Sequence, residues 1–176
     1  MGKIFKQKKV KLVASIIFRE DNMREKAEGK LRRLYGATEP LEKELPFDYT
    51  DYYSGEMGTS LKRKLICFKK LISKENVSKT KIRTNGIEGL FSREGKRTVN
   101  IDPGYITEAK LVLLTTKDYT HRIYVGKQIF AESTLYFCDG VFRSWPWTYP
   151  DYASEEMKSY FNDVRRLFIK QTGNKE

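Results

Sequence analysis

The chain has 176 residues, of which 39% are hydrophobic and 13% aromatic, and this suits one domain with one core, residues 1–176. The formal charge of +11 favours acidic partners, among them nucleic acid, anionic lipid and phosphorylated small molecules. No apolar run has the length of a transmembrane helix or a signal peptide, and the two cysteines form no CxxC pair, so we exclude a disulfide framework and expect a cytoplasmic protein without a membrane partner.

Basic residues gather in several short clusters. The lysine-rich residues 1–9 are predicted to form a flexible basic arm. The clusters KRK (62–64), KK (69–70) and RR (165–166) are interpreted as solvated faces, with a binding surface as the alternative. Charge therefore suggests a class of partner but does not select a site.

The first half of the chain alternates between strand and helix patterns. A β-rich run at 11–18 precedes a helix that Asp21 or Asn22 caps and that stops at Gly36. The next predicted elements are an extended segment at 44–53, a strand at 61–72, a helix at about 75–92 and a strand at 97–102. This β-α-β-β-α-β order predicts an α+β fold with a ferredoxin-like antiparallel sheet.

The second half is predicted to extend this core with a β-meander and a terminal helix. Residues 107–117 fit either a buried strand or a short helix, and both remain open. Three strands then follow at 121–125, 128–138 and 141–145, joined by the two-residue turns Gly126-Lys127 and Asp139-Gly140. The last helix runs from about Ser154 to Lys170, with Met157, Phe161, Val164 and Phe168 on one apolar stripe.

The first of these turns determines what faces the single histidine. A two-residue loop at Gly126-Lys127 places His121 opposite Glu132, with Cβ atoms about 5 Å apart. Glu132 would orient the imidazole and His121 would transfer a proton, with Asp118 nearby as a further candidate catalytic residue. A three-residue loop would place Ser133 opposite His121 instead, and a structural role for the histidine is the alternative.

The second turn brings indole rings to the same place. A two-residue loop at Asp139-Gly140 places Trp145 opposite Thr134 and Trp147 opposite Glu132. One acid, one imidazole and two indoles would therefore share one face of the sheet.

A second candidate site lies at the end of the strand at 97–102. Asn100 and Asp102 point to the same face of this strand. Pro103-Gly104 suits the two central positions of a type II turn, so Asp102 would start that turn, or alternatively bind a ligand or a metal ion.

The segment PFDYTDYYSGEMG supplies further acids and rings. An extended backbone places Asp51 and Tyr53 on one side, and Glu56 lies in the tip that follows. Aromatic strands of this kind commonly pack in a core, and the alternative is a surface that stacks a base. Asp51, Glu56 and Asp102 would bind magnesium if the fold brings them together.

Several known catalytic patterns are missing from the sequence. It contains no GxxxxGK[ST] phosphate-binding loop, no GxSxG and no HExxH. A single histidine cannot supply a multi-histidine metal site, so a hard cation held by carboxylates is the metal chemistry that remains.

Several longer segments carry a family resemblance. These are DYTDYYSGEMG, TNGIE, VNIDPGYIT, TTKDYTHRIY and WPWTYPDY. In this order and spacing they resemble the bacterial and archaeal family known as domain of unknown function 4416, from about Val10 to about Lys170. The resemblance implies a single-domain cytoplasmic protein, and it transfers no activity and no catalytic residue.

We therefore expect a small enzyme or ligand-binding domain for a phosphate-bearing metabolite or nucleotide. Lys117, Arg122 and Arg97 would hold the phosphate. Asp102 with Asp51 would bind magnesium or position the ligand. The other candidate ligand contacts are Asn100, Tyr53 and Trp147.

Two alternatives of other classes remain. The charge and the tyrosines of a ferredoxin-like sheet would suit an RNA-binding module, although no RNP1 pattern is present. The aromatic segment WPWTYPDY would suit a non-catalytic assembly partner.

Overall fold

The structure, a computed structural model, describes residues 2–3 and 7–173, so the predicted basic arm lies partly outside the described residues. Strands and helices alternate in the first half of the chain, with a short 3-10 helix, η1, before α3, and five strands follow one another in the second half before the last helix. The elements are β1 (Val10–Phe18), α1 (Asp21–Tyr35), β2 (Lys43–Phe47), α2 (Ser54–Met57), β3 (Leu61–Ile72), η1 (Lys74–Asn76), α3 (Val77–Leu90), β4 (Val99–Ile106), β5 (Lys110–Thr115), β6 (Ile123–Tyr124), β7 (Phe130–Cys138), β8 (Val141–Ser144) and α4 (Glu155–Thr172).

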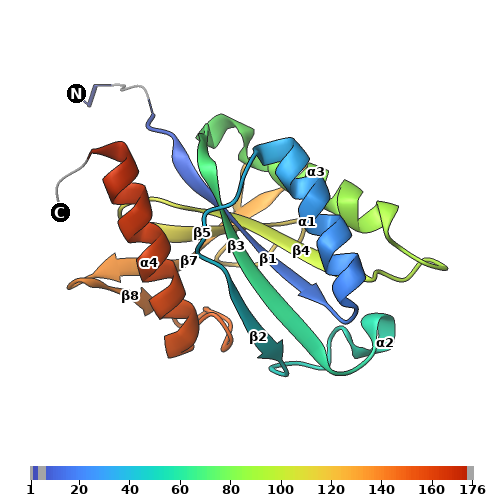
Figure 1. The fold of residues 1–176 in the computed structure, drawn as a ribbon. Coiled ribbons are helices and arrows are strands. Elements are labelled where there is room, and N and C mark those ends of the chain that lie inside the picture. Colours follow the sequence, from blue (N-terminus) through green and yellow to red (C-terminus); the bar gives the residue numbers. More distant parts are fainter. Residues whose placement is uncertain (1, 4–6, 174–176) are drawn as a thin grey trace.

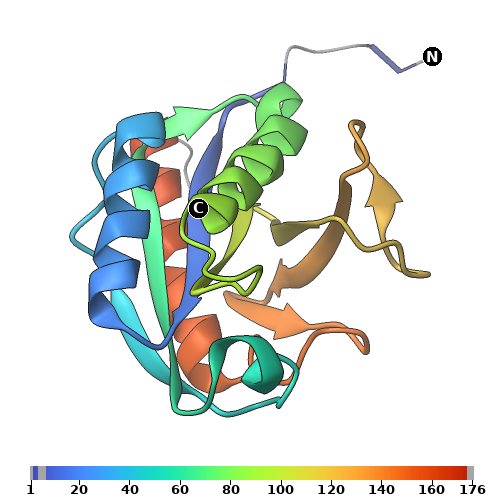
Figure 2. The ribbon, with the colours of Figure 1, turned by 90° about the vertical axis from the view of Figure 1, so that its right-hand side faces the viewer.

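The strands of the described residues form one antiparallel sheet. Its order is β2-β3-β1-β4-β5-β7-β6, and β8 pairs with β7. Figure 1 shows α4 on one side of the sheet and α1 with α3 on the other. Figure 2 shows α1 and α3 from a perpendicular direction. The predicted α+β class, antiparallel sheet and terminal helix are confirmed. No helix of the described part of the chain is long and apolar enough to cross a bilayer.

The central strand β1 is buried on both of its faces. Leu12 and Ile16 point into the core beneath α1 and α3, whereas Val13 belongs to the core beneath α4. Because successive side chains of a strand alternate between faces, both layers are built from one continuous apolar run. The strand order therefore places β1 and its neighbour β4 at the centre of the molecule.

The long helices lie where the sequence predicts them, but their caps differ. The Ser154 hydroxyl accepts a hydrogen bond from the Met157 amide at 3.3 Å, so α4 has the predicted cap. Its stripe residues Met157, Phe161, Val164 and Phe168 are all buried. The predicted cap of α1 is wrong, because Glu20 is the N-cap and makes no side-chain cap bond, while Gly36 ends the helix with φ +89° as predicted.

The segments at 107–117 and 44–53 are also now assigned. The first contains β5, with Leu111 to Leu114 buried in succession, so the strand alternative is correct. The second is a strand only to Phe47. Beyond it the Thr50 hydroxyl accepts from the Tyr52 amide, and the chain turns into α2. Local side-chain to backbone bonds of this kind compete with a continued strand.

The predicted type II turn at Pro103-Gly104 is wrong, because both residues lie inside β4. Pro103 pairs with Ala14 of β1, and β5 pairs with β4 only from Gly104 onward. A Cβ on Gly104 would lie 2.5 Å from the Val112 carbonyl oxygen of β5, so glycine is needed here for close strand approach.

The two hairpins have different outcomes. The β7–β8 register pairs Leu135 with Ser144 and Cys138 with Val141, as the predicted Asp139-Gly140 turn requires. The β6–β7 loop is longer than two residues, because Ile123 pairs with Ala131. Gly126, Lys127 and Gln128 all have positive φ, and this extends the turn and shifts the register by one residue.

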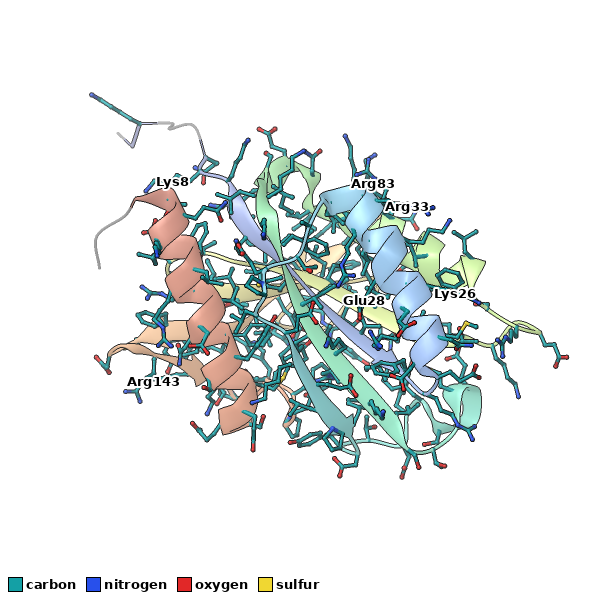
Figure 3. The ribbon with its side chains drawn as sticks, in the orientation of Figure 1. Lys8, Lys26, Glu28, Arg33, Arg83 and Arg143 are labelled. Carbon is teal, nitrogen blue, oxygen red and sulfur yellow. The ribbon has the colours of Figure 1, made fainter. Side chains whose placement is uncertain are left out.

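Basic side chains cover the outer surface of the helices. Lys26 and Arg33 on α1 and Arg83 on α3 are exposed (Figure 3). Lys62 of β3, with a side chain 45% exposed, agrees with the solvated interpretation of its cluster. Arg63 does not, because its side chain is 5% exposed.

Candidate functional site

A cavity of about 430 Å³ lies where β4 and β5 separate. The two strands pair only over Gly104–Ile106, and the gap beyond this pairing is lined by side chains from β2, β3, β4, β5, β7 and α3 and from four connecting segments. The charged residues of this lining are Arg63, Lys81, Glu88, Arg97, Asp102, Lys117, Arg122, Glu132 and Asp151. Four connecting segments far apart in the chain thus meet at one opening in the sheet.

Side chains of α3 replace the missing strand along the open edge of β4. The Ile101 amide donates to Glu88 Oε1 at 2.7 Å, and the Ile101 carbonyl accepts from Lys81 Nζ at 2.9 Å. Pro103 has no N–H to satisfy at this edge, which explains why proline is tolerated inside β4. Burial raises the pKa of Glu88, while the neighbouring Lys81 acts to lower it. The gap is therefore a built feature of the sheet.

A series of hydrogen bonds runs from Glu56 through Arg97 and Asn100 to Asp102. Arg97 donates from Nε and Nη2 to the two oxygens of Glu56, at 2.8 and 2.6 Å. Its Nη1 donates to Asn100 Oδ1 at 2.7 Å, and Asn100 Nδ2 donates to Asp102 Oδ2 at 2.8 Å. The Arg97 bonds hold the pKa of Glu56 below its ordinary value. Asp102 is thereby held at a defined position in the lining.

Arg63 of β3 is a cavity residue that the sequence interpretation missed. Its Nη2 lies 2.6 Å from Asp151 Oδ2, and its guanidinium lies over the rings of Phe47 and Tyr152, at 4.6 and 5.0 Å from their centroids. The alternation Leu61, Arg63, Leu65 was a usable signal, because it places Arg63 on the apolar face of the strand.

Exposed tyrosines surround the mouth of the cavity. Tyr49, Tyr52, Tyr119 and Tyr149 line it and are each about half-exposed. Lys117 Nζ donates to the Tyr52 hydroxyl at 2.8 Å, and this bond lowers the pKa of Tyr52. The bond joins the segment after β2 to the segment after β5 across the opening.

Glu132 of β7 also lines the cavity, and both of its carboxylate oxygens have partners. Its Oε2 accepts from Arg122 Nε at 2.7 Å and lies 3.2 Å from His121 Nε2, and its Oε1 accepts from the Thr134 hydroxyl at 3.2 Å. Arg122 Nη1 donates to the Lys117 carbonyl at 3.1 Å. Arg122 thus fastens the β5–β6 segment to β7.

His121 contacts Glu132 even though the predicted register is wrong. The residue precedes β6 and lies in a turn, so its side chain is not bound by the strand pairing. Its ring stacks on Trp147 and Tyr119 with centroid distances of 5.6 and 6.3 Å. His121 and Trp147 do not line the cavity, whereas Glu132, which His121 contacts, does.

The other predicted site residues divide into two groups. Tyr53, Arg97, Asn100, Asp102, Lys117, Arg122 and Glu132 line the one cavity. Asp51 and Asp118 are exposed outside its lining, and Glu56 supports it from behind through Arg97. Asp51, Glu56 and Asp102 are not gathered as a magnesium site would require. No group of three or more His, Cys, Asp or Glu side chains within the described ranges could hold a metal ion.

Comparison with known proteins identifies the family. The model of the family described as "Domain of unknown function (DUF4416)" matches residues 8–168, which is nearly the whole chain. The search of curated proteins found no match, and neither did the search of solved structures. The matched range contains the whole lining of the cavity. The chain therefore belongs to the DUF4416 family.

Proposed function

We propose that this protein binds a phosphate-bearing small molecule with an aromatic ring, such as a nucleotide, in the cavity between β4 and β5. The observation that carries the proposal is the combination of basic side chains inside the cavity with four half-exposed tyrosines at its mouth. Ligand pockets commonly have this size and pair aromatic rings with a few placed polar groups.

The lining offers complementary groups for each part of such a ligand. A planar base would stack on the tyrosines, because aromatic rings accept any base through its π-face. Asp102 has carboxylate acceptor sites beyond its contacts with Asn100 and Lys81, and these suit the hydroxyls of a sugar. Arg63 and Lys117 would contact the anionic group.

Proton transfer by the His121–Glu132 pair remains a prediction with less support. Glu132 already accepts from Arg122 and Thr134, and His121 lies outside the cavity lining. A general base needs to reach the proton that it removes, either directly or through one water. We therefore favour binding over catalysis as the activity of this cavity.

A ferredoxin-like core is the finer fold assignment that we propose. It is supported by the strand order β2-β3-β1-β4 and by α1 and α3 on one face of these strands.

RNA binding through the other face of the sheet has less support, since α4 covers the apolar residues there. A steep loss of RNA affinity with rising salt would favour that alternative. A cytoplasmic location is compatible with the free thiols of Cys67 and Cys138.

Two equally exposed tyrosines provide a matched test. Tyr52 lines the cavity and is 61% exposed, whereas Tyr124 on β6 is 59% exposed and lies outside the lining. Calorimetric titration of the wild type with AMP, GMP, CMP and UMP should detect binding of at least one of them. We expect Tyr52→Ala to weaken that binding roughly 10-fold or more, as loss of one stacked base would. Tyr124→Ala should leave it unchanged.

Two outcomes would contradict the proposal. One is that no nucleotide and no sugar phosphate binds the wild-type protein. The other is that Tyr52→Ala and Tyr124→Ala weaken binding equally, because the ligand would then lie outside the cavity. Tyr52→Phe separates the ring from its hydroxyl, which accepts from Lys117.

A further inference from the structure

The Arg63 guanidinium is the most unusual charged group in the cavity. Its side chain is 5% exposed, and its Nε has no hydrogen-bond partner among the described residues. A buried donor without a partner costs free energy, so such a group calls for an explanation. Arg63 lines the cavity, and an oxyanion bound there would reach Nε once the side chains that cover this atom shift.

The surroundings of Arg63 hold its guanidinium in place. The guanidinium lies over the rings of Phe47 and Tyr152, and Asp151 pairs with Nη2. A guanidinium fixed in this way loses little further freedom when it binds an oxyanion. Phosphate and carboxylate oxygens are the acceptors that fit a guanidinium edge best.

Three other cations that line the cavity are already occupied. Arg97 makes its side-chain bonds to Glu56 and Asn100. Arg122 donates to Glu132, and Lys81 donates to the Ile101 carbonyl. Arg63 is thus the buried cation of the described lining with an unused donor atom.

The charge of the lining limits the charge of the ligand. Among the described lining residues, five are basic and four are acidic, so the cavity is close to neutral. A triphosphate would bring several negative charges next to Asp102, Glu132 and Asp151. A single phosphoryl group can lie on Arg63 while the acids accept hydrogen bonds from ligand hydroxyls.

We propose that Arg63 is the anion-binding residue of this cavity and that the ligand carries one phosphoryl group, as in a nucleoside or sugar monophosphate. The inference rests on the proposed function for the identity of the ligand. Asp151 acts as a positioning residue, because it pairs with Nη2 of the guanidinium and leaves Nε without a partner.

The test observes Arg63 directly in the folded wild-type protein. Uniformly ¹⁵N-labelled protein is titrated with inorganic phosphate, then with each nucleoside monophosphate, its nucleoside and its triphosphate, and the arginine Nε–Hε resonances are recorded. We expect the Arg63 resonance to shift with phosphate and with a monophosphate. We also expect the monophosphate to bind more tightly than its nucleoside or its triphosphate.

Variants of neighbouring positions supply the controls. Arg63→Met should weaken monophosphate binding about 10-fold or more, because it removes a charged donor. Lys62→Met changes a half-exposed cation next along β3 and should leave binding unchanged. Arg63→Lys keeps a charge near Asp151 but removes the guanidinium edge. It takes the place of Arg63→Met in the binding measurement if the Met variant does not fold.

The outcomes separate this inference from the proposed function. If monophosphates bind while the Arg63 resonance stays fixed, or if triphosphates bind more tightly, the Arg63 inference is overturned and the proposed function stands. If inorganic phosphate shifts Arg63 but no nucleotide or sugar phosphate binds, the anion site stands and the proposed function is lost. If no anion shifts the Arg63 resonance, the inference is overturned.

Discussion

Two buried ion pairs of the cavity, Glu132–Arg122 and Arg63–Asp151, differ in how many of their hydrogen-bonding groups are used. In the Glu132–Arg122 pair, the carboxylate oxygens accept from Arg122 and Thr134 and contact His121, and the guanidinium also donates to a backbone carbonyl. In the Arg63–Asp151 pair, Arg63 Nε has no partner within the described residues.

This difference separates a structural pair from a binding pair. A buried ion pair whose atoms are all satisfied has nothing left to offer a ligand, and its role is to join the segments that carry it. A buried pair with an unused donor keeps an unfavourable desolvation cost that a ligand can remove. Two similar pairs of residues in one cavity are therefore expected to respond differently to mutation and to anions.

The largest expected effect is on the satisfied pair. Glu132→Ala should lower the free energy of unfolding by about 3–5 kcal/mol, because Arg122, with a side chain 3% exposed, would remain buried without its carboxylate. Urea denaturation measures this change. Glu155→Ala is a suitable control, since Glu155 is 89% exposed in its pair with Lys158 and should change stability by about 0.5 kcal/mol or less. A loss below 1 kcal/mol for Glu132→Ala would break the comparison.

A smaller effect is expected at Glu56, which supports the cavity lining through Arg97. Glu56→Gln should cost about 1–2 kcal/mol at pH 7, since it removes charge-assisted bonds at a partly exposed position. Because Arg97 lowers the pKa of Glu56, its stabilisation is present above the unfolded-state value of about 4.3 and is lost as the pH falls through the lower folded-state pKa.

The pH dependence is the sharper part of this prediction. The stability difference between wild type and Glu56→Gln should be constant from pH 7 to about 5 and should shrink below about 4. Urea midpoints measured across this range provide the data. A difference that grows as the pH falls would show that Arg97 does not stabilise the ionised form of Glu56.

Local patterns in the sequence determine much of the fold. The apolar stripe of α4 and its Ser154 cap are both local signals, and both appear in the structure. The Asp139-Gly140 turn correctly fixes the β7–β8 register, because a two-residue loop leaves no freedom in the pairing. These features depend on residues close together in the chain.

The errors arise where distant segments decide the local conformation. Pro103-Gly104 is typical of a turn, but the approach of Val112 from β5 requires glycine inside a strand. Arg63 lies in a run of three basic residues, and its burial depends on Asp151, far along the chain. No short-range pattern contains either contact.

The contact between His121 and Glu132 was predicted from a strand register that is wrong. The expected His121–Glu132 contact is present, yet the loop that was supposed to create it has a different length. A side chain in a turn can reach its partner without strand pairing. The separation of β4 and β5 brings Lys117 to the same cavity as Arg97, Asn100 and Asp102. No pattern in the sequence predicts this separation.

The smallest expected effect is at His121, and it completes the comparison of the two pairs. His121→Gln should cost about 1 kcal/mol or less, because Glu132 keeps its bonds from Arg122 and Thr134 and glutamine can still donate to it. Ligand affinity should change less than about twofold, since the imidazole is outside the cavity lining. Urea denaturation and calorimetric titration of the same variant measure both quantities. A tenfold loss of affinity with normal stability would instead mean that His121 acts on the ligand, and Glu132 would then belong to the binding machinery together with Arg63.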